Sequence, residues 1–105
     1  MPRGSPSGFT LSREAREDLR SIRTYLKSES TTAWSIVLER LHAAMRLVSA
    51  NPRIGRSRPE ITKHPFRFFL VRPYLVVYNP RTDPVTIAAV LHGAQDIKRR
   101  LRARR

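Results

Sequence analysis

Two apolar stripes with the spacing of an α-helix follow one another in the first half of the chain, and they constrain its fold more than any other feature. The first stripe consists of Ala15, Leu19, Ile22 and Leu26. The second consists of Trp34, Val37, Leu41, Met45 and Val48, and it is broadened by Leu38 and Ala44. Apolar residues that recur every three or four positions predict amphipathic helices. Two such helices joined by a short polar turn predict an antiparallel helical hairpin, whose apolar side must be covered by another layer.

The ends of both helices carry recognisable signals. Ser12 is a favourable N-cap, and Glu14 follows in the first turn, where a negative charge suits the helix dipole. We expect the first helix to run to about Lys27 and the second to be capped by Thr31 or Thr32. Asn51-Pro52 then stops the second helix. The outer face of the first helix is charged, with Arg13, Arg16, Glu17, Arg20 and Arg23.

The second half of the chain has the pattern of β-strands. Residues 66–71 and 74–78 are rich in aromatic and β-branched residues, and Arg72-Pro73 between them predicts a hairpin turn. Residues 79–84 predict a second turn. In residues 85–92 side chains on both faces are largely apolar, as expected of a central strand.

The order of these segments predicts an α+β fold of the type β-α-α-β-β-β. Residues 9–11 form a short first strand, and residues 52–65, with three prolines, predict a surface loop. We therefore expect the helical hairpin to pack on one face of a small antiparallel sheet. The chain has the length of one domain, which we place at residues 9–97. Residues 1–8 are interpreted as a disordered lead-in and residues 98–105 as a basic tail.

Several classes of protein are disfavoured by composition. The chain has no cysteine, so disulfides, thiol nucleophiles and cysteine metal sites are excluded. No run approaches the roughly 18 apolar residues of a membrane span. The start of the chain has no apolar segment of the kind found in secretory signals, so we expect a cytoplasmic protein. The glycines are too scattered for a phosphate-binding loop, and His42, His64 and His92 lie in three different elements. No metal or other cofactor is therefore expected.

The charge of the chain points to an acidic partner. Lysine and arginine number 21 against 8 aspartate and glutamate, a formal net charge of +13. Such a field attracts nucleic acid, an acidic protein segment or an anionic surface. Charge alone does not choose among these partners.

Ribonuclease activity is the one catalytic alternative that the residues support. Cleavage of RNA without a metal needs a base, an acid and cations around the phosphate. Arg67, Arg72, Tyr78 and His92 lie on or beside the predicted strands and would supply these groups if they converged. Each also has an ordinary structural interpretation: solvated strand arginines, a sheet tyrosine, and a histidine bonded to backbone at the end of a strand.

The chain resembles ParE-type toxins of the RelE/ParE superfamily. The resemblance begins with Ser12-x-x-Ala15-x-x-Asp18-Leu19-x-x-Ile22-x-x-Tyr25 in the first helix. It continues through Asn51-Pro52, Gly55-Arg56, Arg67, Val77-Tyr78, Val90-Leu91-His92 and Asp96, and covers roughly residues 9–98. It implies a helical hairpin on a small sheet. It also implies the toxin of a type II toxin–antitoxin pair, which forms a hetero-oligomer with an acidic, ParD-like antitoxin.

The resemblance leaves two branches of the superfamily open. ParE-like members inhibit DNA gyrase, whereas RelE-like members cut messenger RNA on the ribosome. Members of the second branch usually carry an aromatic acid/base residue near the C-terminus. Here no aromatic residue follows Tyr78, and Gln95 stands where relatives have tyrosine. We therefore expect a non-enzymatic gyrase inhibitor, with RNA cleavage by Arg67, Tyr78 and His92 as the alternative.

A third functional hypothesis and two sets of contact residues complete the sequence predictions. A plain nucleic-acid-binding module, whose basic tail follows phosphates, is the third functional hypothesis. The candidates for target contact are Arg56, Arg58, Arg67, Arg99, Arg100 and Arg102. The candidates for antitoxin contact are Trp34, Leu38 and Leu41.

Overall fold

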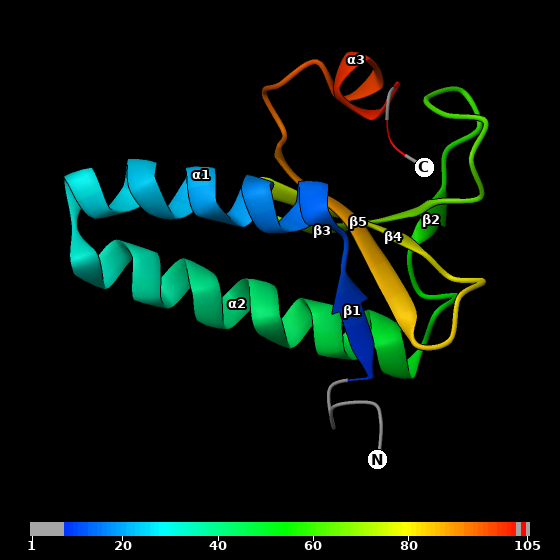
Figure 1. Ribbon diagram of the computed structural model, residues 1–105, viewed down its shortest axis with the longest axis horizontal. Coiled ribbons are helices and arrows are strands. Elements are labelled where there is room, and N and C mark those ends of the chain that lie inside the picture. The colour runs from blue at the N-terminus through cyan, green and yellow to red at the C-terminus, as the bar shows by residue number, and fades with distance from the viewer. Residues whose placement is uncertain (1–7, 103, 105) are drawn as a thin grey trace.

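The predicted helical hairpin is present in the computed structural model, which describes residues 8–102 and residue 104. A short strand, β1 (Phe9–Leu11), leads into α1 (Arg13–Glu29), and α2 (Thr31–Ala50) follows. The two helices lie side by side and run in opposite directions (Figure 1). Apart from Gly8, the expected lead-in lies outside the described residues.

The helix ends differ slightly from the prediction. Ser12 caps α1 as expected, but the helix continues to Glu29. Only Ser30 then separates α1 from α2. Its hydroxyl accepts a hydrogen bond from the backbone N–H three residues further on, at 3.2 Å. The expected caps, Thr31 and Thr32, are therefore wrong, because Ser30 already satisfies a free N–H of the first turn of α2.

The sheet has five strands and is mixed. The later strands are β2 (Arg56–Ser57), β3 (Arg67–Val71), β4 (Tyr74–Asn79) and β5 (Val85–His92). The strand order is β1-β5-β4-β3-β2, and the pairs β2–β3, β3–β4 and β4–β5 are antiparallel. Strand β1 instead pairs with β5 in parallel, with Phe9 opposite Val85. The α+β class is confirmed, but the expectation of a purely antiparallel sheet is wrong, because a three-residue strand carries no local signal for its pairing direction.

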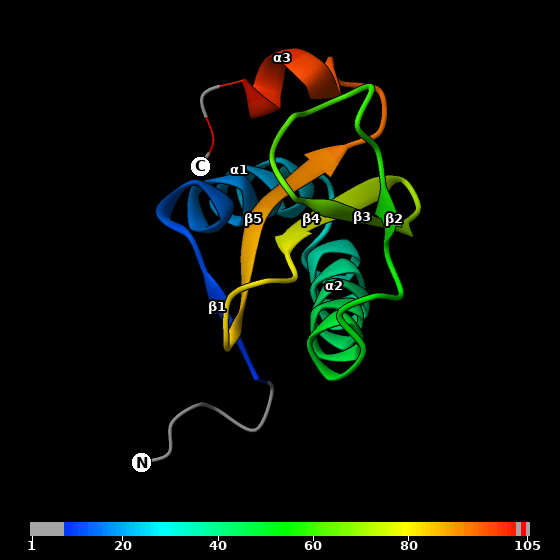
Figure 2. The ribbon, with the colours of Figure 1, turned by 90° about the vertical axis from the view of Figure 1, so that its right-hand side faces the viewer.

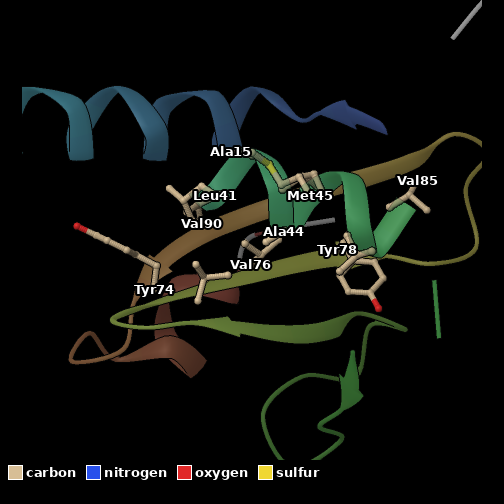
Figure 3. Packing of buried hydrophobic residues seen from close by; sticks show 12 residues of the cluster. Ala15, Leu41, Ala44, Met45, Tyr74, Val76, Tyr78, Val85 and Val90 are labelled. Atoms are coloured by element: carbon tan, nitrogen blue, oxygen red, sulfur yellow. The ribbon is translucent and has the colours of Figure 1, made fainter. Parts of the chain in front are cut away.

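The larger core lies between the helices and the sheet. Figure 3 shows Leu41, Ala44 and Met45 of α2 on the side of the helix that faces Val76 of β4 and Val90 of β5. Leu41 and Val48 of α2 and Val76, Tyr78 and Ile87 of the sheet are 0% exposed. Both sequence stripes contribute to this core, the first through Ala15, Leu19 and Ile22 and the second through Val37, Leu41, Ala44, Met45 and Val48. The prediction of two helices packed on a sheet is therefore confirmed.

A smaller core covers the other face of the sheet. A short helix, α3 (Ile97–Leu101), and the loop before β3 pack there, so that Figure 2 shows α3 and α2 on opposite sides of the sheet. Leu101 is 1% exposed and packs in a cluster with Phe68 and Leu91. Asp96 caps α3 by accepting the Arg99 N–H at 3.2 Å. Helix α3, which continues past residue 97, therefore packs on the sheet through Leu101.

Candidate functional site

Tyr78, on β4, holds the loop that follows α2. Its hydroxyl donates to the carbonyl oxygen of Pro52 at 2.6 Å and accepts the Gly55 N–H at 2.8 Å. A Cβ at Gly55 would lie 2.6 Å from that hydroxyl, so only glycine permits this approach. Burial raises the pKa of Tyr78, although the Gly55 hydrogen bond and the charge of Arg67 act in the opposite direction. Tyr78 is thus a buried anchor of the loop.

Arg67, at the start of β3, fastens the same loop. Its Nη1 donates to the carbonyl oxygen of Gly55 at 2.6 Å and to that of Arg53 at 3.3 Å. The side chain was a candidate both for target contact and for catalysis. In the structure it supports the segment that leads to Arg56 and Arg58. Residues 56–57 of this segment form β2, where the sequence predicted only a loop.

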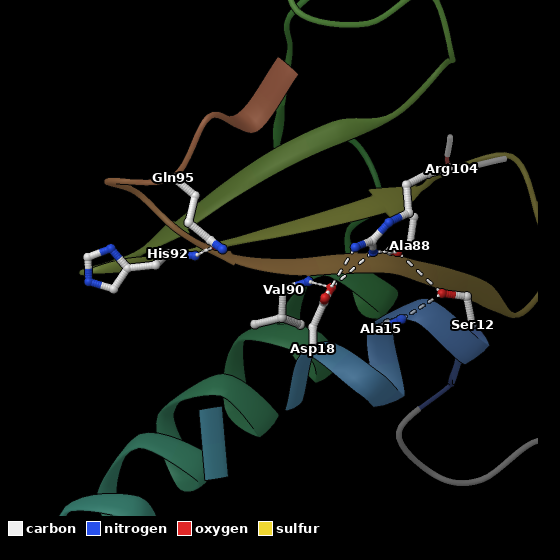
Figure 4. A network of polar contacts seen from close by, with 8 residues as sticks. All are labelled: Ser12, Ala15, Asp18, Ala88, Val90, His92, Gln95 and Arg104. Carbon is white, nitrogen blue, oxygen red and sulfur yellow. Dashed lines mark hydrogen bonds and ion pairs between the residues drawn. The ribbon is translucent and has the colours of Figure 1, made fainter. Parts of the chain in front are cut away.

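His92 ends β5 and is held by its own loop. Its Nδ1 accepts the Ala94 N–H at 3.0 Å, and its backbone N–H donates to Oε1 of Gln95 at 2.8 Å (Figure 4). Its ring also meets Tyr74 edge-on, with the centroids 5.5 Å apart. The interpretation of His92 as a strand-end side chain bonded to backbone is confirmed.

The four ribonuclease candidates lie at two ends of the sheet. Arg67 is opposite Tyr78 in the β3–β4 register, whereas His92 is opposite Tyr74 at the other end of β4. Four residues of extended strand separate these positions by roughly 13 Å. Arg72, in the β3–β4 turn, is exposed at the His92 end. A catalytic acid and base must both reach the reacting phosphate, and this arrangement does not bring Tyr78 and His92 to one phosphate.

A buried polar network joins α1 to β5 and to the end of the chain (Figure 4). Oδ2 of Asp18 accepts the Val90 N–H at 2.9 Å and forms an ion pair with Nη1 of Arg104 at 2.9 Å. Arg104 also donates from Nη2 to Oδ1 of Asp18 at 3.1 Å and from Nη1 to the Ala88 carbonyl oxygen at 2.9 Å. The Ser12 hydroxyl donates to that same carbonyl oxygen at 3.2 Å. Asp18 therefore positions the first helix against the central strand.

An apolar groove runs between α2 and β3. It has a volume of about 540 Å³. Its lining residues are Arg40, Ala43, Ala44, Leu47, Phe69, Leu70, Val71 and Arg72. Leu47 is 41% exposed and Leu70 51% exposed, so two large apolar side chains face solvent here. Arg40 and Arg72 add positive charge to an otherwise apolar lining.

The edge of β3 is open beside this groove. Strand β2 pairs only with Arg67 and Phe68, so the outer edge of β3 from Phe69 to Val71 carries no neighbouring strand among the described residues. An open strand edge with apolar side chains beside it is a template for an extended peptide. The groove and the open edge thus lie beside each other, an apolar cleft next to unpaired strand backbone.

Comparison with known proteins bears on the identity of the whole chain. A family described as "ParE toxin of type II toxin-antitoxin system, parDE" matches residues 9–97. This match covers most of the chain and includes every strand and both long helices. The chain belongs to the ParE toxin family. A search of curated proteins finds no significant match. As a member of this family, the chain is the toxin component of a type II toxin–antitoxin system, which has an antitoxin as partner.

The expected antitoxin contacts of this ParE-family toxin lie in different environments. Leu41 is 0% exposed and belongs to the core, because it sits at the centre of the second stripe. Trp34 is half-buried, and Leu38, in the N-terminal half of α2, is 38% exposed. None of the three lines the α2–β3 groove. The sequence did not single out Leu47 and Leu70 of this groove, although Leu47 lies off the core stripe.

The expected target contacts of the toxin form two groups. Arg56 lies on β2, and Arg58 follows it and pairs with Glu60 at 2.8 Å. The other group, Arg99, Arg100 and Arg102, lies on or directly after α3 and is exposed. The loop after β2 reaches α3, and a crevice of about 420 Å³ opens between them. Its lining residues are Ile61, Thr62, Lys63, His64, Lys98, Leu101 and Arg102.

The structure also bears on metal binding and on membrane-spanning helices. Within residues 8–102 and 104, no group of three or more histidine, aspartate or glutamate side chains is arranged to hold a metal ion. In the same part of the chain, no helix combines the length and the apolar character that crossing a bilayer requires.

Proposed function

We propose that this ParE-family toxin acts in the cytoplasm by binding DNA gyrase directly, and that an acidic, ParD-like antitoxin neutralises it. The observation that carries a binding mechanism is the separation of the catalytic candidates. Tyr78 is buried against Pro52 and Gly55, and His92 lies at the other end of β4. A protein that inhibits its target by binding needs a rigid, charged surface. It does not need catalytic side chains that meet at one point.

The target surface in this proposal is the crevice between the loop after β2 and α3. Lys63, Lys98 and Arg102 line it. Arg56 and Arg58 lie on and directly after β2, where the same loop begins. Both walls are anchored in the smaller core, the loop by Ile61 and α3 by buried Leu101. Positive charges on a fixed scaffold favour fast association with an acidic protein surface.

The antitoxin in this proposal occupies the α2–β3 groove. Its apolar side chains cover Leu47 and Leu70, and its carboxylates meet Arg40 and Arg72. An extended part of the same segment pairs with the open edge of β3. The net charge of +13 steers such an acidic segment toward the toxin. The toxin and antitoxin then form a hetero-oligomer.

Purified gyrase tests the proposed target. The full chain, made by cell-free synthesis, is added to a supercoiling assay, and mRNA integrity is followed in parallel in an in vitro translation reaction. The proposal expects loss of supercoiling with intact mRNA. The R56Q/R102Q variant should inhibit gyrase about tenfold less well, whereas R53Q/R81Q, which removes two exposed arginines elsewhere, should inhibit normally. Rapid fragmentation of mRNA with normal supercoiling would overturn the proposal in favour of RNA cleavage.

A further inference from the structure

One flank of α1 carries a row of five basic side chains. They are Arg13, Arg16, Arg20, Arg23 and Lys27, and all five residues are exposed. Their intervals of three, four, three and four residues place them in one line along the helix. At 1.5 Å of rise per residue the line is about 21 Å long. We call it the α1 ridge.

The α1 ridge is not neutralised by the rest of the described chain. Arg16 donates to the Leu11 carbonyl oxygen at 3.1 Å. The other four side chains form no hydrogen bond or ion pair within residues 8–102 and 104. Of the acidic residues on α1, Asp18 is already paired with Arg104. Glu17 borders the row, yet no ion pair joins it to the ridge among the described residues.

The row also works against the stability of α1. Like charges three or four residues apart on a helix repel each other, and each step of the ridge has this spacing. Arg13 is the first residue of the helix, where the dipole disfavours a cation. The core needs none of these side chains, because α1 packs through Ala15 and its neighbours on another side. A row that is unpaired and unfavourable in the free protein fits a surface that awaits a polyanion.

We propose that the α1 ridge binds duplex DNA by lying along the major groove. A convex helix fits a groove, and the major groove, about 12 Å wide, admits one α-helix. A single strand is usually held by stacking on aromatic side chains, and the ridge has none. An acidic polypeptide that folds on binding needs apolar contacts, which the ridge also lacks. The ridge lies on the helical side of the sheet, whereas the crevice proposed for gyrase lies on the other side.

The salt dependence of DNA binding tests this proposal. The probe is a labelled 20-base-pair duplex of mixed sequence, and the readout is fluorescence anisotropy with the full chain between 50 and 200 mM salt. Five neutralised phosphates give a slope of log K against log salt of about −4.5, a loss of roughly 500-fold over this range. The R13Q/R20Q/R23Q/K27Q variant keeps only Arg16, so its slope should fall to about −1, a loss of only about fourfold.

A matched variant distinguishes binding by the α1 ridge from a general effect of the net charge. R53Q/K63Q/R72Q/R81Q also removes three arginines and one lysine whose side chains form no hydrogen bond in the described chain, and it should keep the wild-type slope. The proposal is overturned if both variants lose the same slope. It is also overturned if a single strand of equal length, or polyglutamate of equal charge, competes as well as the duplex. Circular dichroism confirms that both variants remain folded.

Discussion

Asp18 and Arg104, which are 86 residues apart, form a two-pronged ion pair that fastens the end of the chain to its first helix. The Asp18 side chain is 7% exposed and that of Arg104 is 11% exposed, so the pair is largely removed from water. The same carboxylate accepts the Val90 N–H. One residue of the helix motif therefore holds α1, the central strand and the C-terminal segment together.

Replacing Asp18 with asparagine should destabilise the toxin by about 3 kcal/mol, because it leaves the Arg104 guanidinium buried without a counter-charge. The amide can still accept the Val90 N–H, so the fold should persist at low temperature. Urea denaturation measures the change. Glu17→Gln, which alters an exposed neighbour, should change stability by less than about 0.5 kcal/mol. Equal effects of the two substitutions would show that the buried pair contributes little.

Replacing Tyr78 with phenylalanine should cost about 2 to 3 kcal/mol, because the Gly55 N–H and the Pro52 carbonyl oxygen lose their buried partner. Tyr25→Phe, which removes a hydroxyl from a side chain that is 64% exposed, is the control and should be near neutral. Toxicity of the Tyr78→Phe variant at a permissive temperature should remain. A folded variant without toxicity would instead favour a catalytic Tyr78.

The stability of the toxin should fall as pH rises above about 10. Burial raises the pKa of both Tyr74 and Tyr78 in the folded state. Unfolded tyrosine ionises near pH 10. Above that pH the unfolded chain loses these protons first, so the unfolded state gains stability relative to the folded state. The free energy of unfolding, measured by urea denaturation from pH 8 to 11, should fall less steeply above pH 10 in Tyr78→Phe than in Tyr25→Phe. Parallel curves would contradict a contribution from Tyr78.

Leu101 should contribute to the stability of the fold, whereas the neighbouring arginines should contribute only to binding of the target. Leu101→Ala should cost about 3 kcal/mol, because it empties a buried position of the smaller core. Ile36→Ala, at a position 54% exposed, should change stability by less than about 0.5 kcal/mol. R99Q/R100Q should also leave the thermal midpoint nearly unchanged. A large loss of stability in R99Q/R100Q would show that these side chains support α3.

A glutamate in the α2–β3 groove should weaken antitoxin binding by at least about tenfold. Leu70→Glu places a negative charge where the proposed acidic segment buries its apolar side chains, and the cost of burying an unpaired charge exceeds 1.4 kcal/mol. Ile54→Glu, at a site with a similar exposed fraction but outside the groove, is the matched control. Calorimetry with the purified cognate antitoxin measures the effect of both substitutions. If Leu38→Glu abolishes binding and Leu70→Glu does not, the antitoxin binds the exposed N-terminal half of α2 instead.

Local patterns in the sequence determined the elements of this fold. The stripes through Leu19 and Met45 predicted both helices, because burial on one side of a helix imposes a period of 3.6 residues. Pro73 predicted the turn between β3 and β4, and the apolar run from Val85 predicted a central strand. Each of these signals lies within a few residues of the chain. It can therefore be read from the sequence even when the segment that packs against it is not known.

The tertiary structure alone decided which of these residues meet. The parallel pairing of Phe9 with Val85 joins segments 76 residues apart, and no short pattern encodes it. Leu41 looked available for an antitoxin but is buried, since the sheet covers the centre of its stripe. Tyr78 and His92 looked like one catalytic set, yet strand register places His92 of β5 opposite Tyr74, at the end of β4 away from Tyr78. Register and pairing arise from the packing of the whole chain, which is why sequence patterns show each element and not the contacts between them.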